Sequence, residues 1–280
     1  MSDPTTTVEA PLAYLVTGAA RAEHLIYPPA SGRALVRPEQ EYRRMRITDC
    51  RQLALAPTVD SAGFELLRAP SAIADFYDDE LVQRDYYPEV AAFLRRTLGA
   101  LDIVVFDHHQ RSAARAASGQ TGVRTPVDAA HNDYTPQSGP RRAQEILIAA
   151  GRPAYAGHRL ALINVWRPII GPVEDVPLAV CDARSTAASD FVPTDIHHYG
   201  EYDLEHPRHS GEIYSVRHNP AHQWFYAAHM QPDEVLLLKN WDSATDGRAR
   251  FTPHTGFKNP AAAEGAPRES IEARTLVVFP

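Results

Sequence analysis

The chain of 280 residues is long enough to bury a full core as a single β-rich domain, and its 44% hydrophobic and 22% charged residues are typical of a globular protein. A net charge of -7 argues against nucleic acid as a partner, since nucleic-acid binders concentrate Lys and Arg on one face. Because no apolar run is long enough to span a bilayer and the N-terminus carries no secretory pattern, we expect a cytoplasmic protein whose partner is a small molecule.

Turn residues divide the first half of the chain into short segments. Scattered Pro and Gly without a sustained period predict loops over residues 1–40, laid as an arm over the body. The elements expected after this arm are bounded by turn or capping residues. They are a short hairpin of 53–59 and 63–67, a helix over 85–98 capped by Asp85 and ended by Gly99, a buried strand over 102–107, and a helix over 140–150.

Short apolar runs separated by Gly, Pro, Asn or Asp dominate from residue 158 onward. No helical period intervenes, so the pattern favours an antiparallel barrel or a two-sheet jelly roll, and the fold class is mainly β with flanking helices (α+β). The open mouth of such a barrel is where inward side chains can converge on a metal. The expected strands are HRLALINVWRPI, PLAVCD, EIYSVRH, HQWFYAAHM, EVLLLKNW, ARFTPH and SIEARTLVVF.

His131 and Asp133 are the first candidates for metal ligands. They lie two residues apart, so in extended backbone both side chains emerge on the same side and can grip one ion. The adjacent pairs His108-His109 and His197-His198 point to opposite sides of an extended chain and make poor joint ligands. A carboxylate and two imidazoles that leave one face of the ion open are typical of non-haem iron(II) oxygenases.

The third ligand is expected at His254, late in the chain on the penultimate strand candidate. A double-stranded barrel would bring this strand back beside the first sheet. His218, His222 and His229 are the competing candidates, each with an alternative role as a polar residue of the barrel wall.

Arg268 and Ser270 follow His254 on the last strand candidate and share one face of it. The presence of this pair after His254 favours His254 over its competitors as the third ligand. A guanidinium beside a hydroxyl binds a carboxylate at two points, which is what a 2-oxoglutarate-type cosubstrate requires at its far end. The alternative for Arg268 is a surface ion pair with Glu264 or Glu269.

The order His131-x-Asp133, His254, Arg268-x-Ser270 resembles the iron(II)/2-oxoglutarate-dependent dioxygenase superfamily. More narrowly, the chain is similar to the gibberellin-desaturase-like and cephalosporin 7α-hydroxylase-like oxygenases of fungi and bacteria, over roughly residues 45–280. The segments that carry this likeness are NVWRPIIGPVEDVPLAVCDARS, HQWFYAAHMQPDEVLLLKNWDS, FTPHTGFKNP, PRESIEAR, DFYDDELVQRDYYPEV and VVFDHHQR.

The resemblance implies a double-stranded β-helix (jelly-roll, cupin-like) barrel that requires Fe(II), 2-oxoglutarate as cosubstrate, and O2. The implied activity is hydroxylation, desaturation or cyclisation of a small molecule in secondary metabolism. His131, Asp133 and His254 would be the catalytic metal ligands, and Arg268 and Ser270 would anchor 2-oxoglutarate. Residues 1–45 would form an arm and 46–280 a single oxygenase domain, with N-terminal helices and an insertion between 134 and 253.

Four further positions are weaker candidates for the same site. Arg274 is the fallback cosubstrate anchor, Asn164 a cosubstrate contact, and Trp166 and Tyr226 walls of the substrate pocket. The alternatives to this function are a cupin-like isomerase or hydrolase, a non-haem iron oxidase that does not use 2-oxoglutarate, and a non-catalytic barrel. The pattern specifies neither the metabolite nor an oligomeric state.

Overall fold

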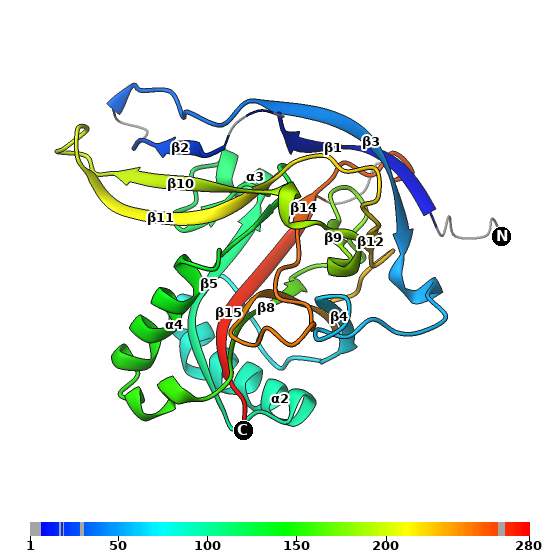
Figure 1. Cartoon of the computed structure of the whole chain (residues 1–280), viewed down its shortest axis with the longest axis vertical. Coiled ribbons are helices and arrows are strands. Elements are labelled where there is room, and N and C mark those ends of the chain that lie inside the picture. The colour runs from blue at the N-terminus through cyan, green and yellow to red at the C-terminus, as the bar shows by residue number, and fades with distance from the viewer. Residues whose placement is uncertain (1–6, 17, 19, 29–30, 263–266) are drawn as a thin grey trace.

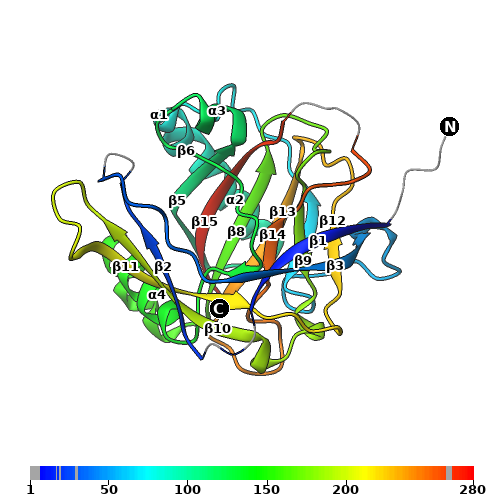
Figure 2. The same ribbon diagram turned by 90° about the horizontal axis from the view of Figure 1, so that it is seen from above.

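The computed structural model describes residues 7–16, 18, 20–28, 31–262 and 267–280 of the chain. Its strands form two sheets, and helices pack against both faces of the smaller sheet (Figures 1 and 2). The fold is thus mainly β, as the short apolar runs predict. None of the helices in these residues is long and apolar enough to cross a membrane.

The larger sheet has nine strands, and most neighbouring strands in it run antiparallel. In spatial order they are β1 (Thr7–Leu15), β3 (Gln40–Asp49), β12 (Trp224–Tyr226), β9 (Leu178–Cys181), β14 (His254–Gly256), β7 (His131–Asn132), β11 (Pro207–Val216), β10 (Phe191–Tyr199) and β2 (Ala22–Ile26).

The smaller sheet has six strands, with β15 at its centre between β8 and β5. In spatial order they are β4 (Phe64–Arg68), β13 (Glu234–Asp242), β8 (Leu160–Pro168), β15 (Glu269–Val278), β5 (Asp102–Ser112) and β6 (Val123–Arg124). The helices are α1 (Asp79–Leu81), the π-helical turn η3 (Val82–Tyr86), α2 (Tyr87–Leu98), α3 (Ala113–Ala117) and α4 (Ser138–Ala149). Single 3-10 turns are η2 (Cys50–Gln52), η4 (Pro153–Gly157), η5 (Ala183–Ser185) and η6 (Ala188–Asp190).

Alternation along β15 separates the packing face of the smaller sheet from its polar face. Ile271 and Ala273 are fully buried in the cluster that includes Leu94 of α2. Side chains of the opposite parity, Glu272 and Arg274 among them, line a cavity on the inner face. Helix α2 therefore packs against one face of β15, and the opposite face of β15 presents charged groups to the cavity.

All seven strands expected after residue 158 are present, as β8, β9, β11, β12, β13, β14 and β15, with shifted ends. The run ARFTPH contributes only its last residue, His254, to β14. One strand was not expected: β10 reads FVPTDIHHY, whose internal Pro193 and adjacent polar residues obscure its alternation.

The prediction of loops over residues 1–40 is wrong for two segments, which form β1 and β2. In β1 the side chains of Val8, Ala10 and Leu12 alternate inward and are buried. Pro11 is tolerated because β1 lies at the edge of its sheet, where a missing N–H costs no ladder bond.

The predicted hairpin is also wrong, because residues 53–59 form no strand and β4 pairs instead with the distant β13. The helix over 85–98 begins differently from the expectation. Asp78, not Asp85, caps the first turn, its side chain accepting from the Leu81 N–H, and the π-helical turn then leads into α2. Gly99 ends α2 as predicted, with a left-handed φ of 63°.

Gly139 of α4 offers a test of the packing between this helix and β13. A Cβ at this position would lie 2.4 Å from Cγ of Trp241, whose ring is buried. We expect Gly139→Ala to lower the free energy of unfolding by about 1–3 kcal/mol, since overpacking outweighs the better helix propensity of Ala. Urea denaturation measures this loss. The matched control is Gly157→Ala, where no atom lies within 4 Å of the added Cβ, and equal stability of the two variants would contradict the packing.

Candidate metal centre

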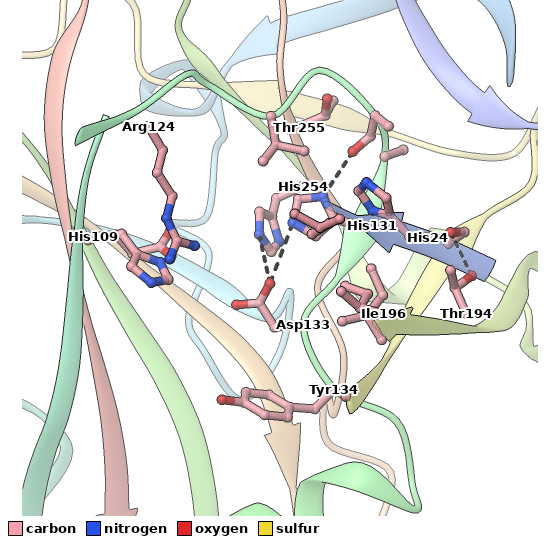
Figure 3. Close-up of a pocket in the computed structure, with 18 of the residues that line it drawn as sticks. His24, His109, Arg124, His131, Asp133, Tyr134, Thr194, Ile196, His254 and Thr255 are labelled. Atoms are coloured by element: carbon pink, nitrogen blue, oxygen red, sulfur yellow. Dashed lines mark hydrogen bonds and ion pairs between the residues drawn. The ribbon is translucent and has the colours of Figure 1, made fainter. Parts of the chain in front are cut away.

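His131, Asp133 and His254 come together where β7 and β14 pair, His254 lying opposite His131 in the ladder. One ligand atom from each lies within 4.8 Å of the other two. Asp133 Oδ1 is 3.4 Å from His131 Nε2 and 3.8 Å from His254 Nε2, and the two imidazole centroids are 4.3 Å apart (Figure 3). The structure therefore brings together all three residues that the sequence proposes as ligands.

Both imidazoles are held by the same local bond. Nδ1 of His131 bonds the carbonyl of Ala129 at 2.9 Å, and Nδ1 of His254 bonds the carbonyl of Thr252 at 3.0 Å. Since a carbonyl only accepts, each Nδ1 carries the proton and each Nε2 presents its lone pair to the centre. Such bonds are typical of histidines that ligate metals.

Asp133 is oriented by Asn164, whose Nδ2 donates to Asp133 Oδ2 at 2.8 Å. This bond occupies one carboxylate oxygen and leaves Oδ1 directed between the two imidazoles. Asn164 lies on β8 opposite Arg274 in the ladder, so a strand of the smaller sheet positions the carboxylate of Asp133, which directly follows β7 of the larger sheet. Asn164 thus contacts a candidate ligand, a role that sequence reasoning did not assign to it.

The electrostatics of the three residues favour an anionic carboxylate. Burial alone would raise the pKa of Asp133, but the bond to His131, the neighbouring imidazoles and the Asn164 amide hold that pKa below its ordinary value. Burial and the proximity of His131 lower the pKa of His254 to about 4. Burial opposes charge on His131 as well, yet Asp133 outweighs it and raises the pKa of His131.

The donor set fits one metal ion. Imidazole and carboxylate ligands lie about 2.0–2.2 Å from an ion such as zinc, which puts neighbouring ligand atoms about 3 Å apart. The observed separations from Asp133 Oδ1, 3.4 and 3.8 Å, exceed this value by less than 1 Å. Two neutral imidazoles and one carboxylate leave a face of the ion open, the arrangement typical of non-haem iron(II) oxygenases.

Asn132, between the candidate ligands His131 and Asp133, points the other way and connects the segments of the site. Its Nδ2 donates to the carbonyls of Tyr134 and Asn240, and its Oδ1 accepts from the Thr252 N–H at 2.9 Å. The last bond joins the His131 segment directly to the segment that carries His254. Sequence reasoning missed Asn132, because a buried amide between two ligands has no pattern of its own.

Arg268 lies buried in the same cavity as the triad. Its Nε donates to Ser270 Oγ at 3.1 Å, one terminal nitrogen donates to the Val176 carbonyl, and the guanidinium lies 5.0 Å from the centroid of the Trp166 ring. Burial and the nearby Arg111 lower the pKa of Arg268 to about 9, so it remains a cation at neutral pH. The alternative partner Glu269 binds Arg115 and Tyr77 instead, and Glu264 lies outside the described residues.

Comparison with known proteins identifies the family. The protein-family model described as "Oxidoreductase/YMDC permease-like domain" matches residues 12–278 of the chain. The chain is 35% identical over 242 residues to "Hydroxylase/desaturase efuI" of Hormonema carpetanum, and 30% identical over 234 residues to "Alpha-ketoglutarate-dependent dioxygenase phiK" of a fungal species, each match covering 79% of both chains. Among solved structures, a variant of the "iron and alpha-ketoglutarate-dependent endoperoxidase NvfI" superposes with a TM-score of 0.84 at 26% identity, covering 99% of each chain.

The chain belongs to the iron(II)/2-oxoglutarate-dependent dioxygenases. It is an oxidoreductase that requires Fe(II), 2-oxoglutarate and O2, as the resemblance of its motifs implies. This membership argues against a cupin-like isomerase or hydrolase, a non-haem iron oxidase that does not use 2-oxoglutarate, and a non-catalytic barrel.

The cavity of the dioxygenase has a volume of about 710 Å3, a size typical of sites for small molecules. The triad lies within it. Trp166 of β8 and Arg268, which directly precedes β15, line one wall of the cavity. His24 of β2, a strand of the larger sheet, lies beside the triad (Figure 3). Strand β2, near the N-terminus, therefore contributes a side chain to the cavity.

Two of the weaker candidates are placed differently. Arg274 lines the cavity, but its guanidinium binds the carboxylate of Asp107. Tyr226 is buried in the apolar cluster of the larger sheet, with its ring 5.6 Å from that of Phe257, and it does not line the cavity.

The competing histidines lie away from the triad. His222 is buried, with Nε2 3.1 Å from Asp190, and His229 bonds Glu174. The ring of His218 packs edge-on against Tyr14 at 5.3 Å. His109, in contrast, lines the cavity although its adjacent pair with His108 gave no reason to expect it there.

The Asn164 amide bond predicts a specific defect in the dioxygenase. We expect Asn164→Ala to weaken binding of Fe(II) by about 10–100-fold, the usual loss when the group that orients a metal ligand is removed. Anaerobic titration with Fe(II) measures it. The conservative Asn164→Gln variant and a melting curve control for misfolding, and wild-type affinity in a folded Asn164→Ala protein would show that Asp133 needs no such support.

Proposed function

We propose that Nε2 of His131, Nε2 of His254 and Oδ1 of Asp133 hold Fe(II). The observation that carries this proposal is the convergence of two imidazoles, each with its Nδ1 bonded to a carbonyl, on a carboxylate oxygen that Asn164 leaves available. Bound there, Fe(II) supplies the redox chemistry by which O2 converts 2-oxoglutarate to succinate and CO2 and oxidises a second substrate.

We infer that the two sheets form a double-stranded β-helix within a single oxygenase domain of residues 46–280, with 1–45 as an arm. In support, β7, β8 and β9, and again β12, β13, β14 and β15, alternate between the two sheets along the chain. The segment between Asp133 and His254, expected to hold an insertion, supplies α4 and the strands β8–β13.

Arg268 with Ser270 is the proposed anchor for the distal carboxylate of 2-oxoglutarate. Arg268 has no carboxylate bound to its guanidinium in the described residues, whereas Arg274 binds Asp107. A buried cation is costly without an anion, so the incoming carboxylate would compensate a charge that the fold already holds. The face of Trp166 restricts the guanidinium on one side.

The second substrate is proposed to be a small metabolite, since the cavity has the volume of a small-molecule site. The relatives named as a hydroxylase/desaturase and an endoperoxidase support hydroxylation, desaturation or ring formation as the outcome. The residues of the chain position this molecule and exclude water, Trp166 being one wall.

Removal of the third ligand tests the metal assignment. We expect His254→Ala to abolish Fe(II) binding and formation of succinate, because one imidazole and one carboxylate hold the ion poorly. The matched control is His229→Ala, which removes an exposed histidine that sequence reasoning also considered. Fe(II) is measured per folded protein after desalting, and full iron content in His254→Ala would refute the assignment.

Removal of the anchor tests the cosubstrate assignment independently. We expect Arg268→Ala to raise the Kd for 2-oxoglutarate by at least about tenfold while Fe(II) remains bound, from the loss of about 1.5–3 kcal/mol in charged hydrogen bonds. Arg274→Ala is the comparison variant. An unchanged Kd in Arg268→Ala together with a raised Kd in Arg274→Ala would transfer the role to Arg274.

A further inference from the structure

The edge of the smaller sheet beyond β15 carries a second group of nitrogen-rich side chains that face the cavity. His109 and Arg111 belong to β5, and Arg124 belongs to β6. In the ladder Arg111 lies opposite Ser270 on one side and beside Arg124 on the other. Neighbouring strands lie about 4.8 Å apart, so the backbone of Arg124 is about 10 Å from β15 and its anchor residues.

Arg124 is an exposed cation of this wall that has no acidic partner among the described residues. No carboxylate oxygen of the described residues lies within 4.0 Å of its guanidinium. Several other cations of the cavity have an acidic neighbour: Arg274 binds Asp107, Arg142 binds Glu145, and Arg111 interacts with the buried Glu272. Arg268 and the exposed Arg141 of α4 have no bound carboxylate among the described residues, and Arg268 is assigned to 2-oxoglutarate.

His109 lies beside Arg124 on the side of the triad opposite His24 and Ile196 (Figure 3). Burial, followed by the charges of Arg124 and Arg111, lowers the pKa of His109 to about 3. The imidazole is therefore neutral and offers one N–H beside a permanent cation. A neutral donor and a guanidinium side by side form a two-point site for an anionic oxygen group.

The charge of the loaded site strengthens this conclusion. The positive charges of Fe(II) and Arg268 balance the negative charges of 2-oxoglutarate and Asp133, so loading leaves Arg124 uncompensated. Apolar side chains, Ile26, Leu35 and Ile196, line the same cavity and suit an uncharged molecular body.

We propose that His109 and Arg124 bind an anionic oxygen group of the oxidised substrate, such as a carboxylate, while its apolar body lies toward Ile26, Leu35 and Ile196. This inference rests on the proposed function, because it assigns Arg268 to 2-oxoglutarate and so leaves the β5–β6 wall for the second substrate. The substrate class is thus an apolar metabolite that carries an acid.

The test uses 2-naphthylacetate and its uncharged methyl ester as probes, with protein loaded anaerobically with Fe(II) and saturating 2-oxoglutarate. We expect the acid to bind at least about tenfold more tightly than the ester, as for a charge-assisted pair. Arg124→Gln should remove this preference, and Arg124→Lys should retain part of it. Isothermal titration calorimetry measures each Kd.

The matched control is Arg141→Gln, which removes an exposed cation from α4 on the lining of the same cavity and should leave the preference unchanged. Equal affinity for acid and ester, no binding of the acid, or equal loss in Arg124→Gln and Arg141→Gln overturns the inference. The Kd for 2-oxoglutarate is measured in every variant. Failure of wild-type protein to bind 2-oxoglutarate overturns the proposed function as well, whereas normal 2-oxoglutarate binding without an acid preference overturns this inference alone.

Discussion

The pairing of two very short strands, β7 and β14, is the contact on which the site depends. It sets His131 opposite His254, and Asn132 reinforces it by accepting the Thr252 N–H. Each imidazole is then aligned by the carbonyl two residues before it. Backbone geometry, rather than contacts between side chains, therefore orients both nitrogen ligands, and such preorganisation lowers the cost of binding a metal.

The central strand β15 links this site to the rest of the molecule. Its apolar face, with Ile271 and Ala273, packs under α2, and its polar face carries Glu272 into the cavity, next to Arg268, which directly precedes the strand. Buried charges of this kind rarely stabilise a fold, since the loss of hydration is large. Their retention on a rigid strand is understandable where incoming anions compensate them, and the cosubstrate is such an anion.

The three residues of the candidate metal centre could be singled out in the sequence because their signal is local or chemical. His131 and Asp133 share a face by strand alternation alone, and the Arg268-x-Ser270 pattern singled out His254. Asn132, Asn164 and His109 carried no such signal, since their roles follow from partners on strands that only the fold brings near. The β4–β13 pairing was missed for the same reason: a run of apolar residues indicates a strand but not its partner.

Diffraction at the iron absorption edge, from crystals grown anaerobically with Fe(II) and 2-oxoglutarate, tests the central claim most directly. The account predicts one anomalous peak bonded to Nε2 of His131, Nε2 of His254 and Oδ1 of Asp133, with the distal carboxylate of 2-oxoglutarate on Arg268. A peak at other residues, or a cosubstrate carboxylate bound by Arg274 or Arg124 in place of Arg268, would contradict it.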